Sequence, residues 1–277
     1  MASAHAAAHP AIQPGGSCMP EATTHPAGTP TWFDLSTGKP EEAKAFYTAL
    51  FGWEFEDYGP ELGHYHRARK DGEEIAGMVP QSPQMPDMPS AWSVYFASDD
   101  AHADAARIRE LGGSVLVEPM QVMNLGHMMV ATDPTGAVFG LWQPIDFHGY
   151  TVAAEHGAPA WQEVLTRDSG KARDFYTTLF HSTAQAVPGG LTYYTLKQGD
   201  TETAGIMQMD EGHWPASVPP HWMTYFAVDD VQQALKTAEE HGGRVNVPPF
   251  ASPFGTIAIL ADPDGAVFSV IQLSQPA

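Results

Sequence analysis

Alternating hydrophobic and polar residues, interrupted once by a longer amphipathic stretch, open the folded part of the chain. Residues 30–36 predict a strand, and Pro40–Phe51 predicts a helix because its apolar residues recur at helical spacing on one stripe, at Ala43, Phe46, Tyr47 and Leu50. Pro40 suits the first turn of a helix, and Gly52 suits its end. Short strands separated by Gly and Asp turns then follow, within residues 53–58, 63–69 and 74–80.

The same order of elements follows a second time. Residues 93–98 predict a strand and residues 101–111 a helix that ends at Gly112-Gly113. Three further strands are expected within residues 114–119, 126–132 and 137–143. The first half of the chain therefore predicts two β-α-β-β-β modules.

An internal repeat doubles this arrangement. Phe46-Tyr47-Thr48 with Leu50-Phe51 recurs as Phe175-Tyr176-Thr177 with Leu179-Phe180, at an offset of 129 residues. The same offset relates Trp32 to Trp161, Asp34 to Glu163, and the segment 133–139 (DPTGAVF) to 262–268 (DPDGAVF). Chance does not produce so many matches in order, so the chain holds two copies of one unit. The fold class expected is α+β, with four βαβββ modules in two tandem domains.

The repeat sets the expected domain boundaries. Residues 1–28 are rich in Ala, Pro and Gly without helix or strand period, and we expect a disordered leader that lacks the features of a secretory signal. The first domain is expected at 29–145, a linker at 146–157 and the second domain at 158–277.

Composition narrows the classes of partner. The chain has 13 Lys+Arg against 33 Asp+Glu, a formal net charge of −20. This charge repels nucleic acid and anionic lipid, so we expect neither partner, and it favours neutral or cationic ligands. The sequence has no apolar run long enough for a membrane span. Cys18 is the only cysteine, which excludes an intramolecular disulfide and indicates a cytoplasmic protein.

The chain resembles the glyoxalase/bleomycin resistance/dioxygenase (vicinal oxygen chelate) superfamily in three features. These are the order of the modules, the helix end Phe-Tyr…Leu-Phe-Gly-Trp at 46–53, and the Asp-Pro-x-Gly hairpins. The chain is particularly similar to tandem two-domain members of the actinobacterial type. The resemblance covers residues 30–145 and 158–274. It implies that paired modules curl into a U-shaped sheet with a cleft, one in each domain.

Metal-using members of this superfamily hold a divalent ion through His or Glu residues on the first and last strands of each module. Counting from the shared motifs, the matching positions are occupied by Trp32, Gly77, Ser93 and Gly140 in the first unit and by Trp161, Gly205, Met223 and Ser269 in the second. None of these residues is a good metal ligand. We therefore expect no cofactor, with a divalent metal at a displaced site as the alternative.

Other residues keep that alternative open. Asp34 and Glu163 lie two residues beyond the tryptophans and share their face, so each could contact a ligand, form a structural hydrogen bond, or serve a metal or a reaction. His64 and His66 share a face of one expected strand, and His127 could join them. Their counterparts in the second unit are Thr192, Tyr194 and Thr256, which do not preserve such a site.

The residues expected to line the clefts are mostly aromatic. They are Trp32, Asp34, Ser93, Tyr95 and Trp142 in the first domain, and Trp161, Glu163, Tyr193, Met223 and Tyr225 in the second. Flat aromatic walls with few polar groups suit a planar hydrophobic ligand, although some of these side chains could belong to the core. No motif for a catalytic nucleophile or a phosphate loop occurs.

The sequence thus favours a metal-independent protein that binds or sequesters a planar hydrophobic small molecule. The alternatives are a glyoxalase-like lyase or isomerase or a dioxygenase with a non-standard metal site, and an interaction protein with vestigial clefts. We expect a monomer whose two domains pack together. The two clefts differ at several positions, such as Ser93 against Met223, so we do not expect them to bind identically.

Overall fold

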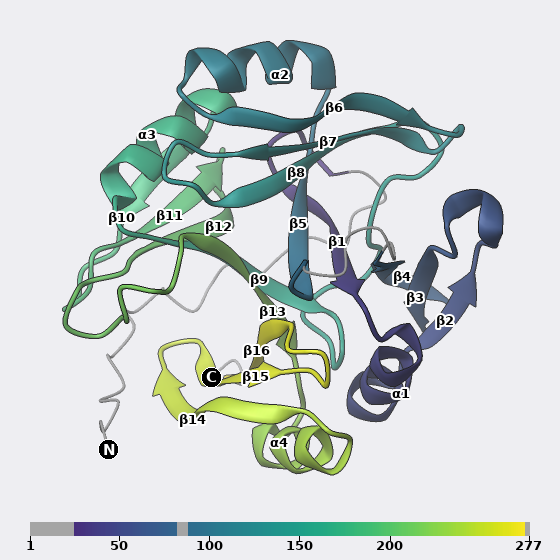
Figure 1. Cartoon of the computed structure of the whole chain (residues 1–277). Coiled ribbons are helices and arrows are strands. Elements are labelled where there is room, and N and C mark those ends of the chain that lie inside the picture. Colours follow the sequence, from purple (N-terminus) through teal and green to yellow (C-terminus); the bar gives the residue numbers. More distant parts are fainter. Residues whose placement is uncertain (1–24, 82–87, 275–277) are drawn as a thin grey trace.

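The computed structural model describes residues 25–81 and 88–274, which form two eight-stranded mixed sheets (Figure 1). The first sheet has the order β2-β3-β4-β1-β5-β8-β7-β6 and the second the order β10-β11-β12-β9-β13-β16-β15-β14. Each sheet contains two β-α-β-β-β modules from one half of the chain. The α+β fold with four modules in two tandem domains is therefore confirmed.

The elements of the first domain follow one another as two modules. The first comprises β1 (Pro30–Thr37), α1 (Pro40–Phe51), β2 (Glu54–Asp57), a single 3-10 turn (Pro60–Leu62), β3 (His66–Lys70) and β4 (Glu73–Pro80). The second comprises β5 (Ala91–Ala97), α2 (Ala101–Glu110), β6 (Ser114–Val122), β7 (Gly126–Thr132) and β8 (Val138–Pro144).

The second domain repeats this series. Its first module comprises β9 (Pro159–Thr166), α3 (Ser169–Leu179), β10 (Thr183–Ala186), β11 (Tyr193–Gln198) and β12 (Thr201–Gln208). Its second module comprises β13 (His221–Ala227), α4 (Val231–Glu240), β14 (Arg244–Ser252), β15 (Gly255–Ala261) and β16 (Val267–Leu273).

Local sequence signals explain where the helices begin and end. Asp100, Asp168 and Asp230 cap α2, α3 and α4, because each carboxylate accepts backbone N–H groups of the first turn. Helix α1 starts with Pro40, whose fixed φ suits that position, and ends at Gly52, whose φ of 76° is easily reached without a side chain.

Each sheet has two unlike faces. One face, which we call the helix face, carries Phe33, Trp92 and Phe96 and packs under the helices. Side chains alternate along strands, so the intervening residues, such as Asp34, Ser93 and Tyr95, lie on the opposite side, which we call the inner face. The candidate site is built on the inner face.

The helix faces of the two domains pack against each other. Helix α1 lies beside α4, and α2 lies beside α3 (Figure 1). Aromatic rings meet across this interface, including Phe46 with Phe268 and Phe96 with Trp222. One continuous core cluster consequently contains buried residues of both domains, which supports the expectation that the domains pack together.

Two equivalent hydrogen bonds, one from each domain to the other, connect the domains across this interface. The Tyr47 hydroxyl donates to Oδ2 of Asp262 at 3.2 Å, and the Tyr176 hydroxyl donates to Oδ2 of Asp133 at 3.0 Å. The other oxygen of each aspartate accepts backbone N–H groups of its own Asp-Pro-x-Gly turn. The motif therefore both builds the hairpin and joins the two domains.

The segments outside the two sheets also make specific contacts. Residues 1–24 of the expected leader lie outside the described residues, whereas Gly28, still within that expected leader, donates its N–H to the Ala97 carbonyl. In the expected linker, Tyr150 donates its N–H to the Thr31 carbonyl and Thr151 to the Glu74 carbonyl. The linker thereby runs between the beginnings of β1 and β4. Within the described residues, no helix is long and apolar enough to cross a membrane.

Candidate functional site

The strand register brings the residues expected in the first cleft together on the inner face of the first sheet. Asp34 lies opposite Ser93, Trp32 lies opposite Tyr95, and Ala97 next to them pairs with Trp142. Paired residues point to the same side of a sheet, so all five predicted residues belong to one surface. In the second sheet, Trp161 pairs with Tyr225 and Glu163 with both Met223 and Gly205. Gly205 pairs in turn with Thr195, two residues beyond Tyr193, which places this fifth predicted residue on the same inner face.

Asp34 is the centre of a small hydrogen-bond network. Its Oδ1 accepts from the Trp32 indole N–H at 3.0 Å and from the Tyr65 hydroxyl at 2.8 Å. The indole N–H also lies 2.8 Å from the Tyr65 hydroxyl. The Tyr95 hydroxyl interacts with the same carboxylate. A charged group is thus held between aromatic side chains by neutral donors.

This environment perturbs the titration of the carboxyl group. Removal from water raises the pKa of Asp34 to about 6, and the hydrogen bonds from Tyr65 and Trp32 limit the rise. Burial also raises the pKa of the Tyr65 and Tyr95 phenols far above their usual range. Asp34 therefore ionises close to physiological pH while both phenols remain protonated donors. Such perturbed groups are concentrated at functional sites.

The expected linker supplies part of the surface. The Phe147 ring packs edge-on against Trp32, with ring centres 4.7 Å apart, and also contacts Trp142. The Trp142 indole N–H donates to the Phe147 carbonyl at 2.8 Å, which fixes the linker in place. The Arg67 guanidinium lies over the Phe147 ring at 4.1 Å and binds Glu74. The inner face therefore already packs against one aromatic ring of the chain itself.

Every member of the Asp34 network has a counterpart in the second domain. The Tyr225 hydroxyl donates to Oε1 of Glu163 at 2.6 Å, and the Trp161 indole N–H donates to the Tyr193 hydroxyl at 3.0 Å. Tyr193 also interacts with Glu163. The duplication has preserved a carboxylate, two phenols and an indole on each inner face, although the hydrogen bonds connect them differently.

The two inner faces differ in how far they are exposed. Asp34, Tyr65 and Ser93 are partly exposed; Val79, on the strand beside Asp34, is 39% exposed, and Met120, on the edge strand β6, is 51% exposed. On the second sheet Glu163 is 2% exposed, and Met207, the counterpart of Val79, is 4% exposed. Around Asp34 the first inner face is partly exposed, although Trp32, Tyr95 and Trp142 are buried, whereas around Glu163 the second inner face is buried.

Large side chains close the second inner face. Trp214 and Val218, from the loop between β12 and β13, pack against its core cluster together with Phe250 and Phe254. Arg167 holds this loop by donating to the Pro215 and Val218 carbonyls. The corresponding loop of the first domain includes residues 82–87, which lie outside the described residues.

The donor set of the first inner face does not fit a divalent metal. Gly77 and Ser93 flank Asp34, and Gly140 pairs with Tyr95, so the neighbouring positions offer at most one hydroxyl. A Cβ on Gly77 would lie 1.9 Å from the Tyr65 hydroxyl oxygen, so this phenol occupies the space of a side chain. Within the described residues, no group of three His, Cys, Asp or Glu residues is placed to hold a metal ion.

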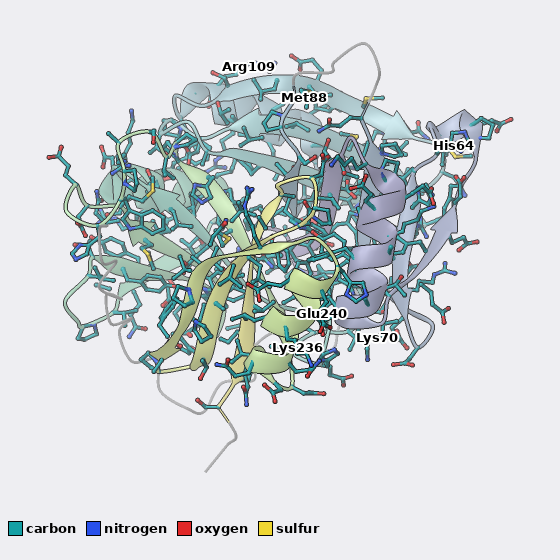
Figure 2. The ribbon with its side chains drawn as sticks, turned by 60° about the horizontal axis from the view of Figure 1, so that its bottom comes forward. His64, Lys70, Met88, Arg109, Lys236 and Glu240 are labelled. Atoms are coloured by element: carbon teal, nitrogen blue, oxygen red, sulfur yellow. The ribbon has the colours of Figure 1, made fainter. Side chains whose placement is uncertain are left out.

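The histidines considered as alternative ligands lie away from the inner face. His64 is in a turn before β3, with a φ of 58° and its Nδ1 2.9 Å from Asp57, and Figure 2 shows it at the edge of the molecule. The prediction that His64 and His66 share a strand face is therefore wrong, because β3 begins at His66. His66 pairs with Met78 and His127 with Gln143, which places both on the helix face.

Two surface hollows lie on the helix side of the molecule. One of about 350 Å³ lies between α1 and β2–β3 and is bordered by Lys44 and His66. The other, of about 470 Å³, lies along α2 and is bordered by Arg107 and Thr178. Neither hollow is bordered by Trp32, Asp34, Ser93, Tyr95 or Trp142 of the first inner face.

Sequence reasoning missed two residues of this site. Tyr65 is the counterpart of Tyr193, which was predicted to line the second cleft, so the repeat itself could have identified Tyr65. Phe147 lies in the expected linker and has no counterpart within the described residues. Only the path of the chain reveals its position.

Two tandem α+β domains of paired βαβββ modules, with an acid-centred aromatic inner face in each, define the class of this protein. The family model of the Glyoxalase/Bleomycin resistance protein/Dioxygenase superfamily matches residues 29–141 and 158–270. The chain belongs to this superfamily.

Relatives share the tandem organisation over nearly their whole length. The chain is 39% identical over 261 residues to CFP32, a candidate glyoxylase of Mycobacterium tuberculosis (92% of this chain, 98% of the relative). It is 37% identical over 262 residues to the anthracycline biosynthesis protein DnrV of Streptomyces peucetius (90% of this chain, 94% of the relative).

Solved structures share the fold at much lower identity. The Mn(II)-bound glyoxalase of Novosphingobium aromaticivorans has a TM-score of 0.63 at 14% identity, covering 91% of this chain and 86% of that protein. The 2,3-dioxygenase LapB of Pseudomonas sp. KL28 has a TM-score of 0.63 at 13% identity, covering 92% and 95%. At this identity the likeness establishes the fold alone.

Proposed function

We propose that this protein binds a planar, hydrophobic small molecule against the inner face of its first sheet, without a metal ion. The observation that carries the proposal is the carboxylate of the partly exposed residue Asp34, which lies among Trp32, Tyr65 and Tyr95. An aromatic surface with one convergent polar group is typical of small-molecule sites.

Exposed apolar side chains support this assignment. Met120 pairs with Met128, and Met128 pairs with Trp142, so both methionines extend the aromatic surface on the inner face. Val79, opposite Ser36, borders it on the other side of Asp34. Methionine side chains also adapt their shape to flat ligands.

The contrast between the domains supports one ligand per chain. Ser36, Val79 and Ser93 of the first domain correspond to Leu165, Met207 and Met223 of the second, which are all at least 95% buried. Each replacement is larger and adds apolar contacts to a packed core. The second inner face therefore stabilises the fold, and the first retains the accessible surface.

The name of one relative agrees with a planar aromatic ligand. DnrV is described as an anthracycline biosynthesis protein, and anthracyclines contain a planar ring system. The name of CFP32 favours a second candidate, a glyoxalase-type enzyme. The enzyme candidate requires a metal ion, whereas the binding protein does not. The donor set around Asp34 does not suit a metal ion, which supports the binding protein.

Metal analysis combined with fluorescence titration separates these functions. Trp32 and Trp142 lie on the proposed surface, so a bound aromatic compound should quench tryptophan fluorescence. We expect saturable quenching by tricyclic aromatic compounds in protein treated with a chelator, and no stoichiometric metal in the purified protein. Binding that disappears on chelation and returns with a divalent metal would favour the enzyme. Absence of quenching by any compound would refute the binding function.

A further inference from the structure

We infer that the ligand carries a positive charge beside its planar ring and that the Asp34 carboxylate holds this charge. The inference rests on the proposed function and specifies the chemical class of its ligand.

The charge of Asp34 is not balanced by the protein. Its hydrogen-bond donors, the Trp32 indole and the Tyr65 phenol, are neutral. Within the described residues Asp34 forms no ion pair, and the cation that affects it, Arg67, is engaged elsewhere. The Arg67 guanidinium contacts Glu74 at 3.4 Å and lies over the Phe147 ring. A carboxylate in low-dielectric surroundings without a counter-ion favours a cationic partner.

The surroundings of Asp34 add to this preference. Trp32, Tyr65 and Tyr95 place apolar ring atoms around the carboxylate, which lowers the local dielectric and strengthens its attraction for a cation. The whole chain has a formal charge of −20, which raises the local concentration of cations near its surface. Local contacts and the overall field therefore act in the same direction.

The second domain provides an internal comparison. Glu163 occupies the equivalent place but is 2% exposed, so no ligand reaches its carboxylate in this structure. Asp34 remains partly exposed although its environment is otherwise similar. Besides accepting hydrogen bonds from Trp32 and Tyr65, a charge without a counter-ion in this partly exposed place discriminates between ligands by their charge.

The inference predicts a specific pH dependence. Tyr65 from β3 and Tyr95 from β5 face the carboxylate, and burial raises the pKa of both phenols so that they stay neutral. Arg67 from β3 is the cation that lowers the pKa of this carboxyl group from a distance. Asp34 is thus the group facing this spot that changes its charge between pH 5 and pH 8. Because burial raises its pKa to about 6, the affinity for a cation should fall as the pH is lowered through this value.

Three probes with one ring system test the charge. Anthracen-9-ylmethylamine is cationic, anthracen-9-ylmethanol is neutral and anthracene-9-carboxylate is anionic. Titrations at pH 8 should show the amine binding about 10-fold or more tightly than the alcohol, with the carboxylate weakest, because a charge-assisted contact contributes that much. Lowering the pH to 5 should weaken binding of the amine and should change the affinity for the alcohol by less than about 2-fold.

Two matched variants assign the effect to Asp34. Asp34→Asn should weaken binding of the amine about 10-fold and should change the affinity for the alcohol by less than about 2-fold. Asp71→Asn removes the same charge from an exposed turn, where the Asp71 side chain is 85% exposed, and should bind all three probes like the wild type. Unfolding curves of both variants would establish that they are folded.

The outcomes separate the inference from the proposed function. If the amine and the alcohol bind equally, or if Asp34→Asn weakens both equally, the inference is wrong and the binding function stands. If none of the probes binds, the proposed function itself fails. Tighter binding of the carboxylate would contradict the inference directly.

Discussion

Asp34 is a partly exposed residue whose carboxyl group is nevertheless strongly desolvated. The neutral donors Trp32 and Tyr65 stabilise its charge only in part, and desolvation raises its pKa to about 6. This residue therefore costs the fold stability when it is ionised. Groups with strongly perturbed pKa values are concentrated at functional sites, which agrees with the proposed binding role.

Replacing Asp34 with Asn should reveal this cost. The folded-state pKa is raised, so the stabilisation from the bound proton is complete below the unfolded-state pKa and is lost as the pH rises through about 6. Between pH 5 and pH 8 the wild type should lose about 1 kcal/mol relative to Asp34→Asn. Urea unfolding at both pH values measures the difference. A difference that does not change with pH would contradict the assigned pKa.

Gly77 is needed because its neighbours occupy the space of a side chain. A Cβ at this position would lie 1.9 Å from the Tyr65 hydroxyl oxygen and 2.1 Å from Oδ1 of Asp34. Gly77→Ala should therefore destabilise the protein by about 1–3 kcal/mol and raise the exposure of the network. Gly190→Ala is the control, because a Cβ there meets no atom within 4 Å. Equal unfolding free energies for the two variants would refute the packing described here.

Single residues show how far the sequence predicts the site. The equivalence of Asp34 and Glu163, and of the aromatic residues around them, was predicted from the repeat. Two copies of one fold place equivalent residues in equivalent positions. The closure of the second face did not follow, since Trp214 lies in a loop whose path no periodicity records. Phe147 escaped for the same reason.

At the scale of elements, the hairpins after β7 and β15 connect the two domains. Asp133 and Asp262 each use one carboxylate oxygen for their own turn and the other for a tyrosine of the opposite domain. Trp92 and Trp222 donate their indole N–H groups to these same tyrosines. The Asp-Pro-x-Gly motif was predicted as a turn, and its role at the interface became visible only in three dimensions.

Removing either tyrosine hydroxyl should weaken this connection. Tyr47→Phe and Tyr176→Phe leave a buried aspartate oxygen and an indole N–H without a partner, which should cost about 1–3 kcal/mol each. Tyr58→Phe removes two long hydrogen bonds, one to Glu56 at 3.3 Å and one from Arg69 at 3.4 Å, and serves as the control, with a change below about 0.5 kcal/mol. Thermal or urea unfolding measures all three. A loss no larger than that of the control would show that these hydrogen bonds do not stabilise the interface.

The order of elements was predictable because each has a local signal. The helix ends were predicted from Pro40, Gly52 and Gly112-Gly113, and the strands from alternation. The beginning of β3 was predicted too early, because His64 adopts a left-handed backbone conformation that alternation does not reveal. Pairing of helix faces between domains depends on contacts far apart in sequence, which local patterns do not encode.

The whole molecule shares one core between its two domains. Phe51 of the first domain packs against Phe226 of the second, and Phe180 of the second packs against Phe96 of the first. Gly157, before the second domain, docks on Phe51 and accepts the Trp53 indole N–H at its carbonyl. Each domain consequently covers the apolar surface of the other.

The full chain should therefore unfold in a single cooperative transition. Scanning calorimetry should give a calorimetric enthalpy equal to the van't Hoff enthalpy. Residues 29–145 expressed alone should be unfolded or self-associated, because their helix face would be exposed. Two separate transitions, or a stable monomeric single domain, would contradict a shared core.

The central claim is that an accessible inner face of the first sheet binds one planar ligand without a metal. Calorimetric titration of chelator-treated protein with anthracen-9-ylmethylamine tests this claim. The variant Ser93→Met places in the first domain the residue found at the equivalent position of the second domain, Met223. Ser217→Met, in an exposed loop position, is the control. The account predicts one site per chain, at least about 10-fold weaker in Ser93→Met and unchanged in Ser217→Met. Two equivalent sites, or full affinity in Ser93→Met, would contradict it.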